Sequence, residues 1–163
     1  HREEFIYNQK PSGYYEKTAI RKRPGTVGIC AALMNRYKIE AVPHLICGGF
    51  TKEDTENALI DLHFLQIKNV LALRGDARKF DEKFIPEPGG HDNALDLVKQ
   101  IDGLNHGVYQ DSNIENGSPM DFCIGVAGYP EKHFEAPSLK SDMRFTKKEK
   151  GSGCRLNGKA NVF

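Results

Sequence analysis

The chain has no excess of charge of one sign and no long hydrophobic run. Its 163 residues contain 23 Lys and Arg and 22 Asp and Glu, which gives a formal net charge of +1. No global field therefore attracts nucleic acid or an anionic membrane, and we do not expect a basic-surface binder. No apolar run approaches the roughly 18 to 20 residues that span a bilayer, so we expect no membrane partner.

Paired cysteines and a signal peptide are also lacking. The cysteines, Cys30, Cys47, Cys123 and Cys154, form no Cys-x-x-Cys pair, which favours reduced thiols over a disulfide framework or a zinc knuckle. Residues 1–4 are mostly charged, with no apolar signal segment behind them, so we expect a cytoplasmic protein. The composition, 39% hydrophobic and 28% charged, is typical of a globular domain with one core.

The first third of the sequence predicts a hairpin followed by a helix. Residues 5–20 have the pattern of two short strands around the turn sequence 10–13, Lys-Pro-Ser-Gly, and are expected to project from the core. From Thr26, whose hydroxyl we expect at the N-cap, apolar residues recur at helical spacing. The predicted stripe consists of Val27, Ile29, Cys30, Leu33, Met34 and Tyr37.

Three short apolar runs then alternate with helical patterns. The runs cover 41–47, 69–76 and 122–130, and they are typical of strands buried on both faces of a parallel sheet. Thr51 and Asp54 resemble a capping box ahead of one helix. Further helices are expected from about Asp92 and, on a weaker pattern, over about 138–150.

This alternation predicts an α/β protein with right-handed parallel crossovers. The pattern by itself leaves two architectures open, an open doubly wound sheet and part of a (β/α)8 barrel. In both architectures the chemistry belongs at the carboxyl ends of the strands, so the residues there are the candidates.

Charged and aromatic residues gather at these strand ends. The first run contains His44 and Cys47, the second ends in Arg74-Gly75-Asp76, and Tyr129 and His133 follow the third. Arg, Asp, Tyr and His together suit an anionic, aromatic cofactor. Taken singly, a histidine or cysteine in an apolar run is more often a packing residue.

Arg74 and Asp76 are harder to explain by packing. A charged pair flanking a glycine at a strand end is costly unless the charges face a polar ligand or each other. A metal site made from His44, Asp76 and His133 has no characteristic spacing, so we expect no metal. Without further information, a phosphate-binding α/β domain of unknown ligand remains an alternative.

The strand-end sequences resemble the methylenetetrahydrofolate reductase family. Any one matching segment would be weak, but they recur in the family's order from residue 1 to about 150. The segments are Arg23-Pro24-Gly25-Thr26, Val42-Pro43-His44-Leu45-Ile46-Cys47, Val70-Leu71-Ala72-Leu73-Arg74-Gly75-Asp76, Ala94-Leu95-Asp96-Leu97-Val98 and the ten residues 127–136 that begin Ala-Gly-Tyr-Pro.

The resemblance implies a (β/α)8 TIM barrel that binds FAD at the strand carboxyl ends. NADH or NADPH gives hydride to the flavin, which reduces 5,10-methylenetetrahydrofolate to 5-methyltetrahydrofolate in one-carbon metabolism. Arg74 would meet a phosphate, and Asp76 would tune the flavin and approach the folate, while Tyr129 offers a ring and a hydroxyl. Carried over by position, the FAD contacts are His44, Arg74, Gly75, Asp76, Ala94, Tyr129, His133 and Asp142.

The chain also departs from the family pattern. The family's catalytic glutamate, a general acid, would precede His1 and is absent, as is another flavin contact. Asn93 stands where the family has tyrosine, and Glu149 stands where it has lysine. With about three of eight barrel strands, residues 1–150 are expected to form a partial barrel of very low or no activity, or a non-enzymatic α/β fragment.

The last residues, 151–163, do not resemble the family. This tail is hydrophilic where the family continues into a helix end and a strand. With suitable codons, a reading frame shifted by one nucleotide gives nearly the missing family segment, so we hypothesise a frameshift product. The choice between NADH and NADPH stays open, as does the oligomeric state, a homo-oligomer included.

Overall fold

The computed structural model describes residues 3–77, 83–127, 138 and 140. A helix expected over 138–150 therefore lies outside the described residues, apart from Ser138 and Lys140. The described elements are β1 (Glu3–Gln9), β2 (Tyr15–Lys22), α1 (Thr26–Tyr37), β3 (His44–Ile46), α2 (Lys52–Phe64), β4 (Asn69–Leu73), α3 (Ala94–Asn105) and β5 (Cys123–Val126).

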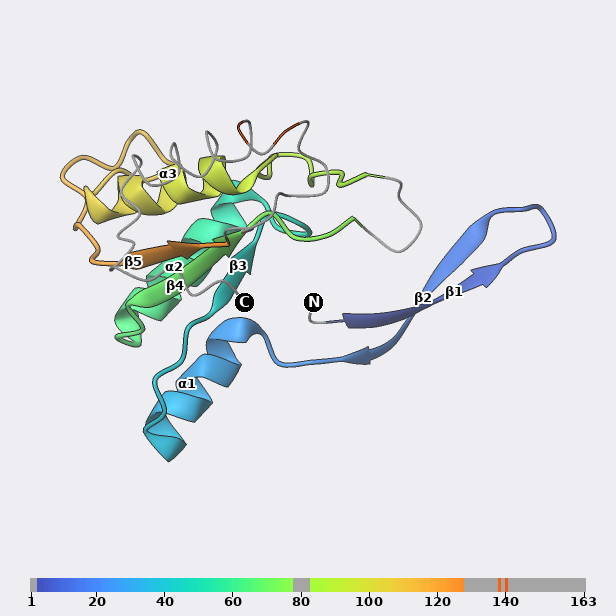
Figure 1. The fold of residues 1–163 in the computed structure, drawn as a ribbon, viewed down its shortest axis with the longest axis horizontal. Coiled ribbons are helices and arrows are strands. Elements are labelled where there is room, and N and C mark those ends of the chain that lie inside the picture. Colours follow the sequence, from blue (N-terminus) through green and yellow to red (C-terminus); the bar gives the residue numbers. More distant parts are fainter. Residues whose placement is uncertain (1–2, 78–82, 128–137, 139, 141–163) are drawn as a thin grey trace.

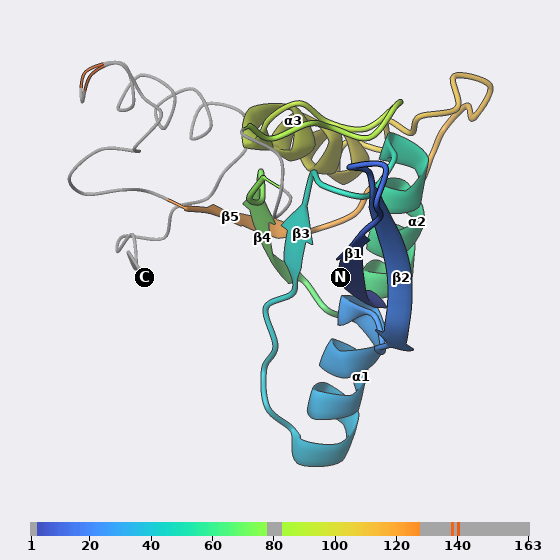
Figure 2. The same ribbon diagram turned by 90° about the vertical axis from the view of Figure 1, so that its right-hand side faces the viewer.

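The predicted N-terminal hairpin is confirmed. β1 pairs antiparallel with β2, and the two strands project away from the other elements (Figures 1 and 2). At the turn, the Gly13 amide donates to the Lys10 carbonyl at 2.9 Å. Gly13 has φ +83°, a conformation that glycine adopts without steric cost.

The three remaining strands form one parallel sheet in the order β3-β4-β5. Consecutive strands are neighbours, and both connections step in the same direction across the sheet. Since parallel crossovers are right-handed, α2 and α3 lie on the same face. This arrangement matches a barrel segment and not a doubly wound sheet, which needs helices on both faces.

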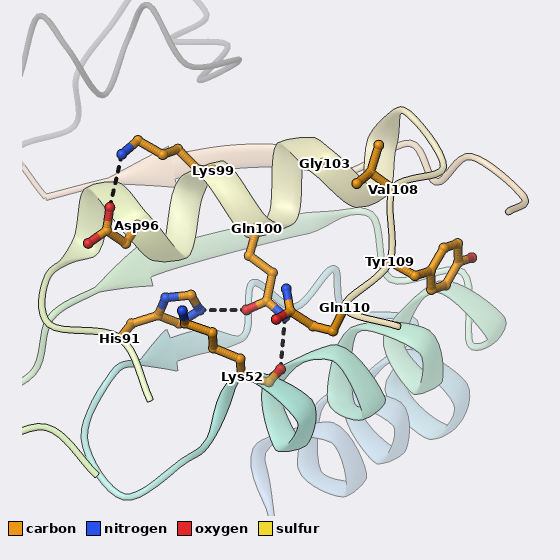
Figure 3. Close-up of a pocket in the computed structure, with 9 residues that line it drawn as sticks. All are labelled: Lys52, His91, Asp96, Lys99, Gln100, Gly103, Val108, Tyr109 and Gln110. Carbon is orange, nitrogen blue, oxygen red and sulfur yellow. Dashed lines mark hydrogen bonds and ion pairs between the residues drawn. The ribbon is translucent and has the colours of Figure 1, made fainter. Parts of the chain in front are cut away.

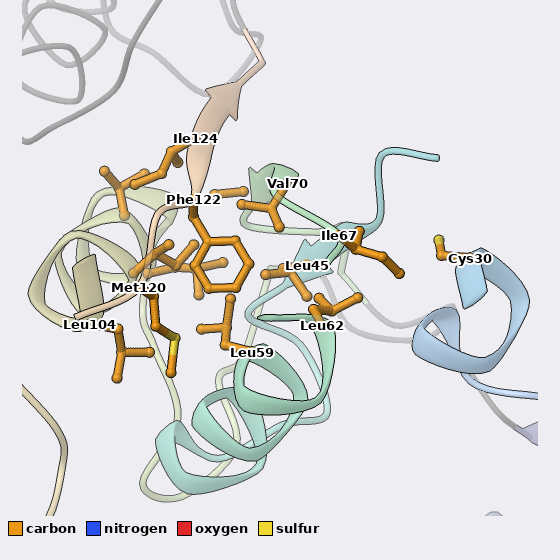
Figure 4. Packing of buried hydrophobic residues seen from close by; sticks show 14 of the residues in the cluster. Cys30, Leu45, Leu59, Leu62, Ile67, Val70, Leu104, Met120, Phe122 and Ile124 are labelled. Atoms are coloured by element: carbon orange, nitrogen blue, oxygen red, sulfur yellow. The ribbon is translucent and has the colours of Figure 1, made fainter. Parts of the chain in front are cut away.

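The core lies between this sheet and its two helices. Leu59 and Leu62 from α2 and Ile101 from α3 are fully buried, as are Val70 and Ile124 from the strands. Figure 4 shows Phe122 and Met120, which precede β5, beside Leu59 and Leu104 in the same cluster.

The expectation that the strands are buried on both faces is wrong for the described residues. Along β4 the burial alternates, with Val70 and Ala72 buried and Leu71 and Leu73 only half-buried. The helices cover one face, and no described element covers the other. The all-apolar runs correspond to what a closed barrel would bury, because the interior of a barrel is filled by side chains.

α2 begins as the sequence predicts. The Thr51 hydroxyl accepts from the Asp54 amide at 3.0 Å, and the Asp54 carboxylate accepts from the Thr51 amide at 3.0 Å. These reciprocal hydrogen bonds satisfy two backbone donors that the helix leaves unpaired. The Thr51 hydroxyl also donates to the Asp54 carboxylate at 2.7 Å, and this hydrogen bond, followed by the one from the Thr51 amide, lowers the pKa of the Asp54 carboxyl.

α1 differs from its prediction in two respects. Its N-cap is Gly25, which makes no side-chain capping bond, and Thr26 is the first helical residue. The predicted apolar stripe is buried only around Cys30, whereas Ile29 is 47% and Tyr37 is 66% exposed. The helix extends away from the sheet (Figure 1), so its outer apolar residues have no described neighbour to pack against.

Candidate functional site

The parallel register brings the carboxyl ends of β3, β4 and β5 to one edge of the sheet. Ile46 pairs with Leu73, and Ala72 pairs with Val126. The residues that follow these positions therefore emerge side by side. The predicted convergence at this edge is confirmed for the strands themselves.

His44 lies slightly below this edge. It begins the three-residue strand β3 and is exposed, whereas the sequence placed it near the strand's end. It pairs with Leu71, which in turn pairs with Gly125. Since paired residues share a face, His44 lies on the face that no described helix covers. Exposure also contradicts the interpretation of His44 as a core histidine.

The segment Arg74-Gly75-Asp76 follows β4 directly. Gly75 has φ +86°, and a Cβ built on it would lie 3.5 Å from the Ile46 Cβ. The Cys47 amide donates to the Leu73 and Arg74 carbonyls at 3.2 Å each. These contacts join the ends of β3 and β4, and the positive φ turns the chain at a residue where other side chains are strained.

The two charged residues of this segment differ in burial. Asp76 is exposed and Arg74 is half-buried. The Arg74 guanidinium carbon lies 5.5 Å from the centre of the Phe84 ring, a cation–π arrangement. Sequence reasoning missed Phe84, because a lone aromatic residue in a Pro/Gly loop carries no periodic signal.

Cys47 lies next to these groups but behaves as a packing residue. Its side chain is 1% exposed, and its thiol donates to the Leu73 carbonyl at 3.4 Å. Burial above all, together with the nearby Asp96 carboxylate, raises the pKa of this thiol to about 11. Because the thiolate is the nucleophile, a thiol with this pKa is unreactive near neutral pH.

Ala94 is the first residue of α3 and is half-buried. Asn93 provides the N-cap, with its side chain accepting from the Asp96 amide at 3.0 Å. An asparagine therefore serves a clear structural role where the family pattern has tyrosine. The other predicted FAD contacts, Tyr129, His133 and Asp142, lie outside the described residues.

A cavity of about 290 Å³ lies between α2 and α3, along residues 108–110 (Figure 3). Within it, the Gln100 amide donates to the Lys52 carbonyl at 2.8 Å, which directs the Gln100 oxygen toward His91. That oxygen accepts from His91 Nε2 at 2.5 Å. Gln100 therefore ties the middle of α3 to the first residue of α2, and buried His91 holds Gln100 from the segment before α3, a role that no sequence spacing revealed.

Acidic and basic groups at the cavity rim neutralise each other. Lys99 donates to the Asp96 carboxylate at 2.9 Å, and this hydrogen bond lowers the pKa of Asp96. No group of three or more metal-ligating side chains occurs in the described part of the chain. Across the same residues, the structure contains no helix with the length and apolar character of a membrane span.

Comparison with known proteins identifies the family. A family model for methylenetetrahydrofolate reductase matches residues 14–155, which is most of the chain. The chain belongs to the methylenetetrahydrofolate reductase family. The resemblance seen in the sequence is thereby confirmed, and the singly wound three-stranded sheet is part of a TIM barrel.

Three curated relatives show how much of such reductases the chain spans. It is 35% identical to methylenetetrahydrofolate reductase (NADH) 1 of Arabidopsis thaliana over 140 residues, 80% of this chain and 22% of that protein. For the probable NADPH reductase of Caenorhabditis elegans the identity is 28%, over 84% of this chain and 18% of the relative. For the 5,10-methylenetetrahydrofolate reductase of Pectobacterium carotovorum the identity is 31%, over 75% of this chain and 34% of the relative. The chain therefore spans about a fifth to a third of these relatives.

Proposed function

We propose that the ends of β3, β4 and β5 form one section of the FAD site of a methylenetetrahydrofolate reductase. The observation that supports the proposal is the single edge to which the parallel register brings the ends of β3 and β4 in a family member, with Arg74 and Asp76 directly after β4 and His44 at the start of β3. When bound, FAD supplies the hydride relay from NADH or NADPH to 5,10-methylenetetrahydrofolate. The product of the complete enzyme is 5-methyltetrahydrofolate.

The residues present fit a flavin dinucleotide. Arg74 presents a planar, permanently charged group, which suits a phosphate of the dinucleotide. Gly75 has no side chain, so a ligand can approach its backbone closely. The Asp76 carboxylate is exposed at the same edge, where its negative charge would disfavour further negative charge on a neighbouring ring and would approach the folate.

The remaining assignments complete the proposal. His44 and Ala94 are proposed FAD contacts, together with Tyr129, His133 and Asp142. The names of the Arabidopsis and Caenorhabditis relatives specify different nicotinamides, so the reductant is written NADH or NADPH. We further propose a cytoplasmic protein whose partial barrel covers 1–150, with 151–163 as an aberrant tail.

A second candidate is a non-enzymatic α/β fragment. Within 3–77 and 83–127, β3 and β5 each pair on one side only, and an unpaired strand edge invites association with another chain. On this account the polypeptide binds flavin only when further barrel strands are supplied.

One expression experiment separates the two candidates. The chain is purified alone and after co-expression with the remaining barrel segments of the Pectobacterium relative, and bound flavin is measured by absorbance. NADH and NADPH oxidation is then followed with an artificial acceptor, and Arg74→Ala serves as the site variant. Flavin and turnover on the chain alone support the enzyme. Flavin only on co-expression supports the fragment, and no flavin in either preparation contradicts the proposed site.

A further inference from the structure

The loops that follow β3 and β4 are in contact at two points. A Cβ built on Gly48 would lie 3.3 Å from the Phe84 ring, so the ring lies directly over this glycine. Further along the loop, the Lys52 amide donates to the Gly89 carbonyl at 3.0 Å. Residues 83–91 are thus held against the turn between β3 and α2.

Phe84 and the loop that carries it make further contacts. The ring is half-buried and packs against the hydrophobic core cluster. Gly90 approaches the Phe50 carbonyl so closely that a Cβ would lie 2.7 Å from this oxygen, a position that only glycine can occupy without a shift. The ring is therefore held in place by its surroundings before any ligand binds.

The Arg74 guanidinium lies over this ring at 5.5 Å. This cation–π attraction acts on the charge of the guanidinium and uses none of its N–H donors. An aromatic ring can thus hold the charge in place without competing for its donors. A guanidinium that is already held in place loses less conformational freedom when it binds an anion.

We infer that Phe84 is a positioning residue for Arg74, holding the guanidinium in place for a phosphate of the bound dinucleotide. The inference rests on the proposed FAD site, and it goes further by assigning a role to a loop residue outside the strand ends. Phe84 acts through Arg74 and is not itself proposed to contact the flavin.

The test compares FAD dissociation constants of variants of the full chain by flavin fluorescence, in whichever preparation retains flavin. Phe84→Leu keeps the apolar packing and removes the ring, so it should weaken binding about three- to tenfold, the range of a half-buried cation–π contact. Phe84→Trp should restore wild-type affinity. Ile85→Ala, at the exposed neighbouring residue, is the matched control and should leave the FAD dissociation constant unchanged. Equal affinities for wild type and Phe84→Leu would overturn the inference.

A second readout keeps this inference separate from the proposed function. In ¹H–¹⁵N spectra without flavin, the Arg74 Nε–H proton should be shielded by the ring in the wild type and in Phe84→Trp, and should move downfield in Phe84→Leu. If the Arg74 Nε–H signal moves in Phe84→Leu but no preparation binds FAD, the contact between Arg74 and Phe84 is real and the proposed function fails. The role of Phe84 in FAD binding is then refuted as well. If the shift is absent, the inference fails whatever the flavin does.

Discussion

Two glycine-to-alanine substitutions should change stability in opposite directions. Gly75 has φ +86°, and a Cβ there meets the nearest atom at 3.5 Å, which is ordinary contact. The cost of Gly75→Ala is therefore conformational, about 1 to 2 kcal/mol for an L-residue in the left-handed region. Reduced freedom of the unfolded chain offsets about 0.4 to 1 kcal/mol, which leaves a net loss of about 1 kcal/mol.

Gly28 is the matched control. It lies inside α1 with a negative φ, and a Cβ there has no atom within 4 Å. Gly28→Ala should therefore stabilise the helix by about 0.5 to 1 kcal/mol. The assay is urea unfolding followed by far-ultraviolet circular dichroism. The free energy of unfolding falls by about 1 to 2 kcal/mol per molar urea. The unfolding midpoints of Gly75→Ala and Gly28→Ala should therefore lie about 1 M apart, on either side of the wild-type midpoint.

Either of two results would refute the expected changes in stability. A midpoint for Gly75→Ala at or above that of the wild type would show that the turn after β4 does not require a left-handed residue. A midpoint for Gly28→Ala below the wild type would show that the exposed surface of α1 is covered in solution.

Three further substitutions test the core and the surface charges. Leu62→Ala removes a fully buried side chain and should cost about 2 to 5 kcal/mol in urea unfolding; a loss under 1 kcal/mol would contradict the packing of α2 on the sheet. Thr51→Ala removes the capping box and should lower the free energy of unfolding by about 1 kcal/mol. Because hydrogen bonds from Thr51 lower the pKa of Asp54 from 3.8, the stability that its carboxylate contributes is present above pH 3.8 and is lost as the pH falls below this value. Thr51→Ala should therefore make the melting temperature less dependent on pH in this range. The hydrogen bond from Lys68 likewise lowers the pKa of Asp121. Lys68→Met should therefore make the melting temperature less dependent on pH below 3.8 and less dependent on salt. A melting temperature with the same pH and salt dependence as the wild type would show that this pair is not formed.

The sequence was most informative where the signal is local. The hydrogen bonds between Thr51 and Asp54 connect residues three apart, and the hairpin turn at 10–13 depends on its own glycine. Such features depend on the chemistry of adjacent residues, so a pattern predicts them without knowledge of the rest of the fold.

Features that depend on distant partners could not be predicted. Residues 70–73 are all apolar and show no alternation, so they did not indicate which face α2 and α3 would cover. The contact of Arg74 with Phe84 and the hydrogen bond of His91 to Gln100 join residues ten and nine positions apart through a loop. Their geometry depends on how that loop packs, which no spacing rule encodes.

In the proposed site, the carboxyl ends of neighbouring strands contact one flavin dinucleotide. The test is a titration of the ¹⁵N-labelled chain with FAD, in the co-expressed preparation if the chain alone binds no flavin, followed by ¹H–¹⁵N spectroscopy of its glycine amides. The account predicts that the signals of Gly48 and Gly75, at the ends of β3 and β4, move with rising FAD, while those of Gly28 and Gly117 stay in place. Signals of Gly28 and Gly117 that move while those of Gly48 and Gly75 do not would contradict it.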